Sequence, residues 1–257
     1  MFTRKTILGV VLLLCITLVV PALATTYYVD PNGNDSADGN TWATAFATIQ
    51  KGITSANDGE PNNYAVIDIN SGIYETGPIT INNNNIELNF RENVEVLAKS
   101  NNDPNEPNLF ANSELFKARN KSGILFDGNN TVFRMRKSEY TTVVQDVIAL
   151  YSCSNVTILN LACKDGGEDG IYIGDANSGG LRCCQNISIK NVICDNNKRN
   201  AISVISVDGL TIEDCILKNT NGAAPECGID LEPNYDIEQL MNIVVNNTRL
   251  ENNASKA

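Results

Sequence analysis

Three stretches of the sequence decide the fold: Asn155-Val-Thr-Ile-Leu-Asn-Leu-Ala-Cys163, Asn186-Ile-Ser-Ile-Lys-Asn-Val-Ile-Cys194 and Gly209-Leu-Thr-Ile-Glu-Asp-Cys-Ile-Leu217. Each alternates apolar and polar residues, as a β-strand does, and a fourth copy begins at Asn242. Polar residues recur in two columns, which contain Asn160, Asn191, Asp214 and Asn247, and then Asp165, Asn196, Asn219 and Asn252. Copies that keep their phase while the segments between them vary in length are typical of the stacked coils of a solenoid.

A second short strand follows each of the first three copies: Gly170-Ile-Tyr-Ile-Gly174, Ala201-Ile-Ser-Val-Ile205 and Gly228-Ile-Asp-Leu-Glu232. Alternation predicts that the Ile, Val and Leu side chains at the second and fourth positions of each strand face inward, and that Tyr172, Ser203 and Asp230 face outward at one level. Gly174, Ile205 and Glu232 are expected outward at the next level.

No amphipathic helix of crossover length separates these strands, so the pattern predicts an all-β fold, a parallel β-helix, rather than an α/β sheet. Asn tolerates the left-handed backbone of tight bends, and its amide can bond the amides of neighbouring coils. A sandwich of antiparallel hairpins is the alternative. Hairpins, however, would not keep two polar columns in phase over four copies.

Residues 1–24 have the features of a secretory signal peptide. Arg4 and Lys5 precede an apolar run from Ile7 to Val20, and Ala22-Leu-Ala24 is a small-residue cleavage site. A retained membrane anchor is the alternative, but the run is short for a span of about 20 residues. We therefore expect a secreted, periplasmic or cell-surface protein with no membrane insertion after cleavage.

The composition narrows the partners and the chemistry. The 257 residues include 19 Lys and Arg against 30 Asp and Glu, a formal net charge of −11, and no His. We expect no nucleic-acid partner, because no basic patch is evident. A polyanion would be repelled unless a local basic cluster or a bridging cation intervened. The lack of His excludes Ser-His-Asp and Cys-His catalysis and His-ligated metals.

Seven of the eight cysteines would remain after cleavage. Cys153 and Cys184 share one phase of the repeat, and Cys163 and Cys194 share another. Neighbouring coils lie about 4.8 Å apart, so either pair could form a disulfide. We favour the other interpretation, thiols stacked in the core as small apolar groups. No Cys-x-x-Cys pair occurs, which argues against a zinc site.

The remainder of the chain predicts one domain. Phe46, Ile49 and Ile53 lie at helical spacing within a helix expected from Trp42 to Asn57. This helix would cover the open end of the solenoid, so residues 25–60 form the expected N-terminal cap and residues 61–257 the coils. The fourth copy is followed by neither an outward strand nor a cap, so we expect the solenoid to be truncated at its C-terminus, and the protein to be a monomer.

Two regions resemble the secreted, pectate-lyase-like superfamily of right-handed parallel β-helix proteins. Residues 27–53 resemble its N-terminal cap, with Tyr-Tyr-Val, a Gly-Asn-Asp loop, Trp and Phe-Ala-Thr-Ile-Gln, and residues 153–234 resemble its coils. The resemblance implies right-handed coils and lyase or hydrolase action on an extracellular polysaccharide. The fold alone does not choose among these activities. The polygalacturonase pattern fails, because it includes Gly-His-Gly. Calcium-dependent lyases of this fold use acidic cation ligands and an Arg or Lys base.

The outward face of the second strands is the candidate site. The small residues Gly170, Ala201 and Gly228 stack there, which would let a ligand approach the backbone. Four residues are candidates for sugar binding on this face: Tyr172, Ser203, Glu168 and Glu226.

Two mechanisms are open for this face. Asp230 and Glu232 could be the acid and base of glycoside hydrolysis, because strand geometry separates them by about 6.7 Å, near the ~6.5–9.5 Å of inverting enzymes. Alternatively, Asp169 and Asp230 could bind Ca²⁺ against a uronate, while Lys198 or Arg199 removes a proton for β-elimination. A non-catalytic carbohydrate-binding or adhesion protein is the rival class, and acidic residues are also common on solvated strand faces.

Overall fold

The computed structural model describes residues 24–56, 64–141, 144–176 and 183–255. Of the expected signal peptide it therefore describes only Ala24, and the expected helix end at Asn57 lies outside the described residues. In the part of the chain that is described, none of the helices combines the length and the apolar character needed to cross a membrane.

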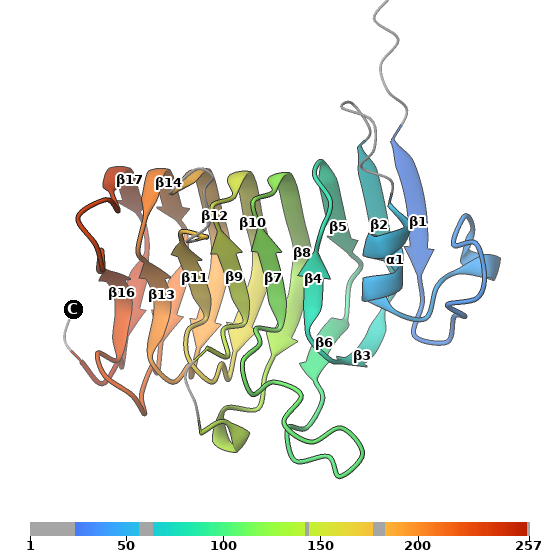
Figure 1. The fold of residues 1–257 in the computed structure, drawn as a ribbon, viewed down its shortest axis with the longest axis horizontal. Helices are drawn as coiled ribbons and strands as arrows, with labels where there is room; N and C mark the ends of the chain where they lie inside the picture. Colours follow the sequence, from blue (N-terminus) through green and yellow to red (C-terminus); the bar gives the residue numbers. More distant parts are fainter. Residues whose placement is uncertain (1–23, 57–63, 142–143, 177–182, 256–257) are drawn as a thin grey trace, which may run out of the picture.

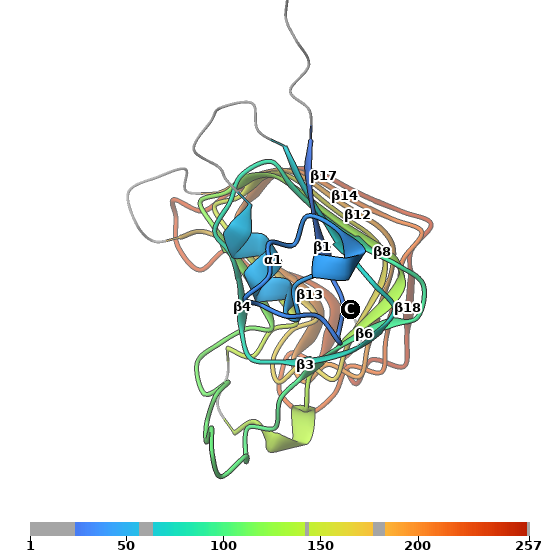
Figure 2. The same cartoon turned by 90° about the vertical axis from the view of Figure 1, so that its right-hand side faces the viewer.

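Two parallel sheets wind around one axis (Figure 1). The main path of the larger sheet contains β1 (Thr25–Val29), β2 (Ala65–Ile69), β5 (Ile86–Phe90), β8 (Ser122–Arg134), β10 (Ser154–Lys164), β12 (Cys184–Asp195), β14 (Val207–Glu213) and β17 (Leu240–Asn246). Pairing with this path or with one another are β3 (Gly72–Thr76), β6 (Val94–Ala98), β15 (Ile216–Lys218) and β18 (Arg249–Glu251). Successive coils overlap when viewed along the axis (Figure 2), which confirms the predicted parallel β-helix.

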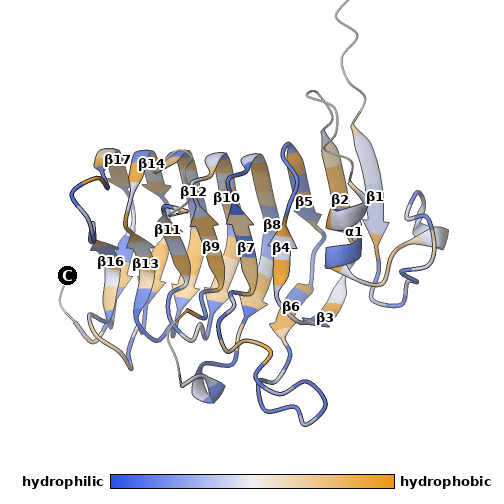
Figure 3. Cartoon of the chain, in the orientation of Figure 1, coloured by the Kyte–Doolittle hydropathy of each residue, from blue (hydrophilic) through white to orange (hydrophobic). Residues whose placement is uncertain are grey.

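The smaller sheet carries the strands predicted after each repeat. Its order is β4 (Ile79–Ile81), β7 (Phe116–Arg119), β9 (Ile148–Tyr151), β11 (Ile171–Gly174), β13 (Asn200–Val204) and β16 (Cys227–Leu231). The larger sheet and this smaller one enclose an apolar core of stacked Ile, Val, Leu, Phe and Cys side chains. Figure 3 shows apolar and polar residues alternating along the strands.

The polar columns form left-handed bends, as the sequence predicted. Asn160 and Asn191 have φ of 56° and 52°, and Asp214 has 56°. Asn191 Nδ2 donates a hydrogen bond to Asn160 Oδ1 over 2.9 Å, and Asn247 Nδ2 donates to Asp214 Oδ1 over 2.6 Å. A carboxylate has no hydrogen to donate, so Asp214 only accepts in this column.

The register is as predicted over three coils, but the inward side chains are fully buried only in the first two. Ile171, Ile202 and Ile229 are successive register partners, and Ile171 and Ile202 have no solvent exposure. Leu231 is 48% exposed, because β16 is the last strand of its sheet among the described residues. Ile205, expected outward, is buried, since it lies in the bend after β13, where strand alternation has ended.

The N-terminal cap differs from the single helix that was expected. A short 3-10 turn (η1, Trp42–Thr44) and a separate helix α1 (Ile49–Ser55) replace it. Asp35 Oδ1 accepts hydrogen bonds from the backbone N–H groups of Ala47 and Thr48. These bonds hold the segment between η1 and α1 extended. α1 still buries Ile49 and Ile53 against β1, β2 and β4. The expected cap boundary shifts, because β1 pairs in parallel with β2 and belongs to the sheet.

The cysteines behave as small apolar groups. All seven in the described residues are free thiols, and all but Cys227 are buried. Cys163 and Cys194 are register partners in β10 and β12, as their common phase predicted.

Candidate active site

The outward face of the smaller sheet brings polar side chains from successive coils into one column. Tyr172, Ser203 and Asp230 are register partners, as expected, and the column continues through Ala149 to Lys117 on β9 and β7. Strands of a parallel sheet lie about 4.8 Å apart, so side chains from β11, β13 and β16 reach one another across the face.

Arg199 is the centre of a cluster of acidic groups. It immediately precedes β13, and its Nη2 lies 3.0 Å from Glu232 Oε2 and 3.8 Å from Asp230 Oδ2. Its Nη1 lies 3.7 Å from Asp169 Oδ2. Residues from three coils therefore converge on one guanidinium group, which presents several donors in a fixed plane.

Asp169 also belongs to a ladder that ties each coil to the next. Asp146 Oδ1 accepts from Asp169 N, Asp169 Oδ1 from Asn200 N, and Asn200 Oδ1 from Cys227 N, over 2.9, 2.9 and 3.0 Å. Asn200 Nδ2 also donates to Asp230 Oδ2 over 3.1 Å. One oxygen of Asp169 is thus structural, and the other, Oδ2, is buried and faces Arg199.

The acids of this face hold their protons more tightly than usual. Burial raises the pKa of Asp169 to about 7, despite hydrogen bonds that favour its charged form. Burial, then the charge of Glu232, raises the pKa of Asp230. The pKa of the buried Asp146 is also raised, first by burial and then by the charge of Asp169. Burial opposes the charge of Arg199, but the surrounding carboxylates outweigh it and raise its pKa.

An aromatic pair flanks the cluster on β9 and β11. The rings of Tyr151 and Tyr172 have centroids 5.3 Å apart, and the Arg119 guanidinium lies 4.4 Å from the Tyr151 ring centroid. Tyr151 Oη donates to Glu114 Oε1 over 2.6 Å, and Lys117 pairs with the other Glu114 oxygen at 2.6 Å. The face therefore combines an aromatic surface with carboxyl groups, a combination suited to sugars.

Sequence reasoning missed Asp146, Asn200, Glu114 and Tyr151. A signal for the first two was present, because Asp146, Asp169 and Asn200 each lie two residues before the first inward Ile of their strand. Glu114 holds the same place, two residues before Phe116, which is the buried register partner of Ile148. For Tyr151 the chain offers no comparable repeat.

Two of the predicted site residues lie elsewhere. Lys198 Nζ donates to Tyr140 O over 2.9 Å, on the opposite side of the turn from Arg199. Glu226 Oε1 accepts from Gly222 N over 2.6 Å within its own turn. Glu168 remains beside the cluster, and its pKa is raised by burial while Arg199 opposes that rise.

Two expectations about the strand surface are corrected. Ser203 has no solvent exposure, and its Oγ accepts from Asn200 Nδ2 over 2.9 Å, so it supports the cluster from beneath. The small-residue column does not face a ligand. A Cβ at Gly170 would lie 2.6 Å from Ala201 O, because the glycine packs against the next coil.

The donor set does not fit the calcium site expected at Asp169 and Asp230. Ca²⁺ takes 6–8 oxygen ligands, roughly 2.3–2.6 Å away, whereas Asp169 Oδ1 is used by Asn200 N and Arg199 lies between the two carboxylates. Among the described residues, no three His, Cys, Asp or Glu side chains are grouped to hold a metal ion.

The raised pKa of Asp169 predicts a pH-dependent stability. The folded protein keeps this proton up to about pH 7, whereas the unfolded chain releases it near the ordinary pKa of the side chain, 3.8. The free energy of unfolding therefore falls as pH rises through this window. Asp169→Asn has no such proton. The difference in melting temperature, variant minus wild type, should therefore increase as pH rises from about 4 to about 8. Thermal unfolding of both proteins measures this, and parallel pH profiles would contradict it.

Comparison with known proteins agrees with this architecture. The chain is 30% identical over 120 residues to "Uncharacterized protein YclG" of Bacillus subtilis (strain 168), a match covering 43% of this chain and 20% of that protein. The chain thus spans about a fifth of the length of this curated relative.

Solved structures show the same fold at low identity. A rhamnogalacturonan lyase matches with a TM-score of 0.59 and 15% identity, over 90% of this chain and 69% of its own. An iota-carrageenase complexed to iota-carrageenan fragments matches with a TM-score of 0.59 and 20% identity, over 89% of this chain and 50% of its own. The family model "Right handed beta helix region" matches residues 67–257. The chain therefore belongs to the right-handed β-helix family, which confirms the handedness that the resemblance implied.

Proposed function

We propose that the protein hydrolyses glycosidic bonds of an extracellular polysaccharide on the outward face of β11, β13 and β16, with Asp230 as proton donor. The observation that carries this proposal is the convergence of Asp169, Asp230 and Glu232 on Arg199, beside the Tyr151–Tyr172 pair. The solved relatives named after rhamnogalacturonan and carrageenan support a polysaccharide as the substrate class. The expected signal peptide supports action outside the cell.

The cluster favours hydrolysis over β-elimination. Elimination would need a neutral base beside the substrate, but the carboxylates around Arg199 raise its pKa and hold it protonated. Lys198, the other base candidate, points to Tyr140. Acid–base chemistry on this face therefore falls to its carboxyl groups.

Asp230 has the properties of a general acid. Its pKa is raised by burial and by Glu232, with which it shares a hydrogen bond. A general acid works best when its pKa lies near the working pH. Arg199 would stabilise the Asp230 carboxylate left after proton transfer, and its Nη2 lies 3.0 Å from Glu232 Oε2. A sugar entering between the two carboxyl groups would separate them. Asp230 would then give its proton to the departing glycosidic oxygen, while Glu232 takes a proton from the water that attacks the anomeric carbon.

A sugar-binding protein without turnover is the second candidate. The exposed part of the Tyr172 ring, stacked on Tyr151, would serve such a protein equally well. Turnover separates the two candidates.

The test is a panel of neutral and acidic polysaccharides with the purified protein, with Ca²⁺ and with a chelator. We expect new reducing ends without the ultraviolet absorbance of an unsaturated product, at equal rates under both conditions. Absorbance that requires Ca²⁺ would overturn the hydrolytic mechanism. Saturable binding without any product would favour the sugar-binding protein.

A further inference from the structure

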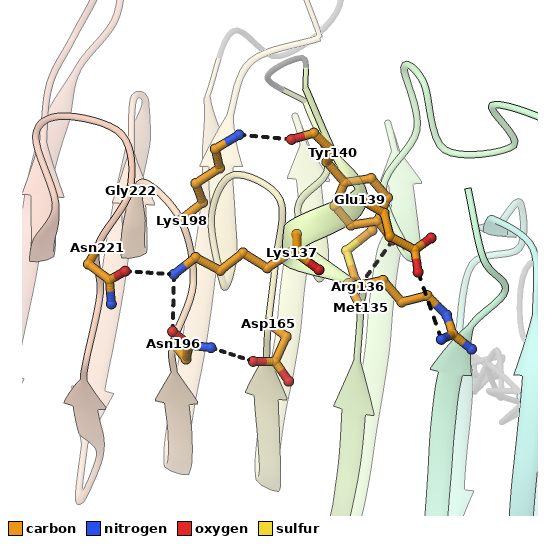
Figure 4. A pocket seen from close by; sticks show the side chains of 11 residues that line it. Met135, Arg136, Lys137, Glu139, Tyr140, Asp165, Asn196, Lys198, Asn221 and Gly222 are labelled. Atoms are coloured by element: carbon orange, nitrogen blue, oxygen red, sulfur yellow. Dashed lines mark hydrogen bonds and ion pairs between the residues drawn. The ribbon is translucent and has the colours of Figure 1, made fainter. Parts of the chain in front are cut away.

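A groove of about 640 Å³ lies on the other side of the turn that carries Arg199 (Figure 4). The segment from Met135 to Tyr140, which includes the 3-10 turn η2 (Lys137–Glu139), forms one wall. The turns after β10, β12 and β15 form the other. Tyr140 packs on Gly167, where a Cβ would overlap its ring, so the segment is held against the coils. The volume is typical of ligand sites, roughly 300–1,000 Å³.

Two lysines from different coils line this groove. Lys137 Nζ donates to Asn196 Oδ1 over 3.0 Å, to Asn221 Oδ1 over 3.2 Å and to Asn197 O over 3.3 Å. Lys198 Nζ donates to Tyr140 O over 2.9 Å, which leaves two of its three hydrogens for other acceptors. All these acceptors are neutral.

The acids of the groove are already paired with arginines. Asp165 Oδ2 lies 2.6 Å from Arg134 Nη1. Glu139 lies 3.9 Å from Arg136 and also accepts from Asn101 N over 2.8 Å. Across the described ranges, neither Lys137 nor Lys198 has a carboxylate at ion-pair distance.

The chain has 30 acids against 19 bases, so most of its surface would repel an anion. Burial lowers the pKa of Lys137; the charges of Asp165 and Glu226 oppose this fall, and the charge of Lys198 adds to it. Two like charges held together in a half-buried place favour an anion that neutralises both. This is the local basic cluster that an acidic protein needs if it is to bind a polyanion.

We propose that this groove binds an acidic group of the glycan, a carboxylate or a sulfate ester, through Lys198 and Lys137. The inference rests on the proposed function and names its substrate as an anionic polysaccharide. Lys198 and Arg199 are consecutive, with Cα atoms about 3.8 Å apart, and their side chains serve opposite sides of one turn. A glycan lying across this turn would contact the Arg199 cluster with one unit and the groove with another.

The test measures binding, so it needs no turnover. Affinity electrophoresis would compare dextran sulfate with dextran, and polygalacturonate with its methyl ester, because each pair differs only in the acidic group. The variants are Lys198→Gln and, as a matched loss of one exposed positive charge, Lys190→Gln on β12, where Lys190 pairs with Glu213.

We expect at least one acidic polymer to bind more tightly than its neutral counterpart. Lys198→Gln should weaken that binding about tenfold or more, while Lys190→Gln stays close to wild type. The polymer that responds, sulfated or carboxylated, identifies the acidic group. Equal binding of the acidic and neutral polymers, or an equal loss in Lys198→Gln and Lys190→Gln, would overturn the inference.

The two proposals fail separately. If binding depends on Lys198 but no glycan gives products, the proposal for the groove is supported and the proposed hydrolase activity is excluded. If a neutral glycan is hydrolysed and Lys198→Gln leaves its KM unchanged, the hydrolase activity is supported and anion binding in the groove is excluded.

Discussion

Replacing Asp230 with Asn is expected to lower the turnover of the polysaccharide by roughly 10²–10⁴-fold while substrate binding stays close to wild type. Asn keeps the shape of the side chain and an oxygen to accept from Asn200 Nδ2, which lies 3.1 Å from Asp230 Oδ2. It cannot donate the proton that the raised pKa of Asp230 retains. The loss should therefore fall on kcat and leave KM nearly unchanged.

The matched control is Glu213→Gln on β14, which removes one carboxylate from the larger sheet, where Glu213 pairs with Lys190 at 2.8 Å. Its turnover should equal that of wild type. Wild-type turnover in Asp230→Asn would exclude Asp230 as the proton donor. A loss of binding that matches the loss of turnover would make Asp230 a binding residue instead.

Replacing Ile202 with Ala is expected to lower the free energy of unfolding by about 2–5 kcal/mol. Ile202 has no exposed surface and lies between Ile171 and Ile229 in register, so the deletion leaves a cavity enclosed by coils on both sides. Leu231→Ala is the comparison, since Leu231 is 48% exposed and its truncation should cost about 1 kcal/mol or less.

Urea unfolding of both variants measures this difference in unfolding free energy, provided that the dependence on urea concentration, the m-value, is the same for both. Equal shifts of the two midpoints would show that the outer edge of β16 is covered in solution as well as the middle of the sheet is.

The fold could be predicted because its rules are local and repeat. Alternation fixes which side chains face inward, and Asn at a bend supplies the left-handed φ, 56° at Asn160 and 52° at Asn191, without help from distant residues. The error at the cap had a tertiary cause. Asp35, twelve residues before Ala47 in the sequence, holds the segment extended by accepting its backbone hydrogens.

Only those contacts of the site that follow from the register of paired strands could be predicted. Arg199, Asp230 and Glu232 meet because β13 and β16 pair as the repeat requires. The direction of Lys198 follows from the docking of residues 135–140, a contact between distant segments that no local pattern encodes. Ser203 was predicted at the right level, but its burial depends on the side chains of Arg199 and Asn200, which fold over it.

The turn before β13 places a constraint on length rather than on composition. Lys198 N donates to Gly166 O and to Glu168 O, and Arg199 N donates to Glu168 O. Backbone hydrogen bonds to the previous coil therefore fix the position of each of these two residues. Deleting one residue from this turn would shift the following residues by one position along these backbone hydrogen bonds. The side chains of Lys198 and Arg199 would then point to the opposite sides of the turn. Exchange of residue types along the turn would cause no such shift. Related chains should therefore retain the number of residues in this turn even where its residue types differ.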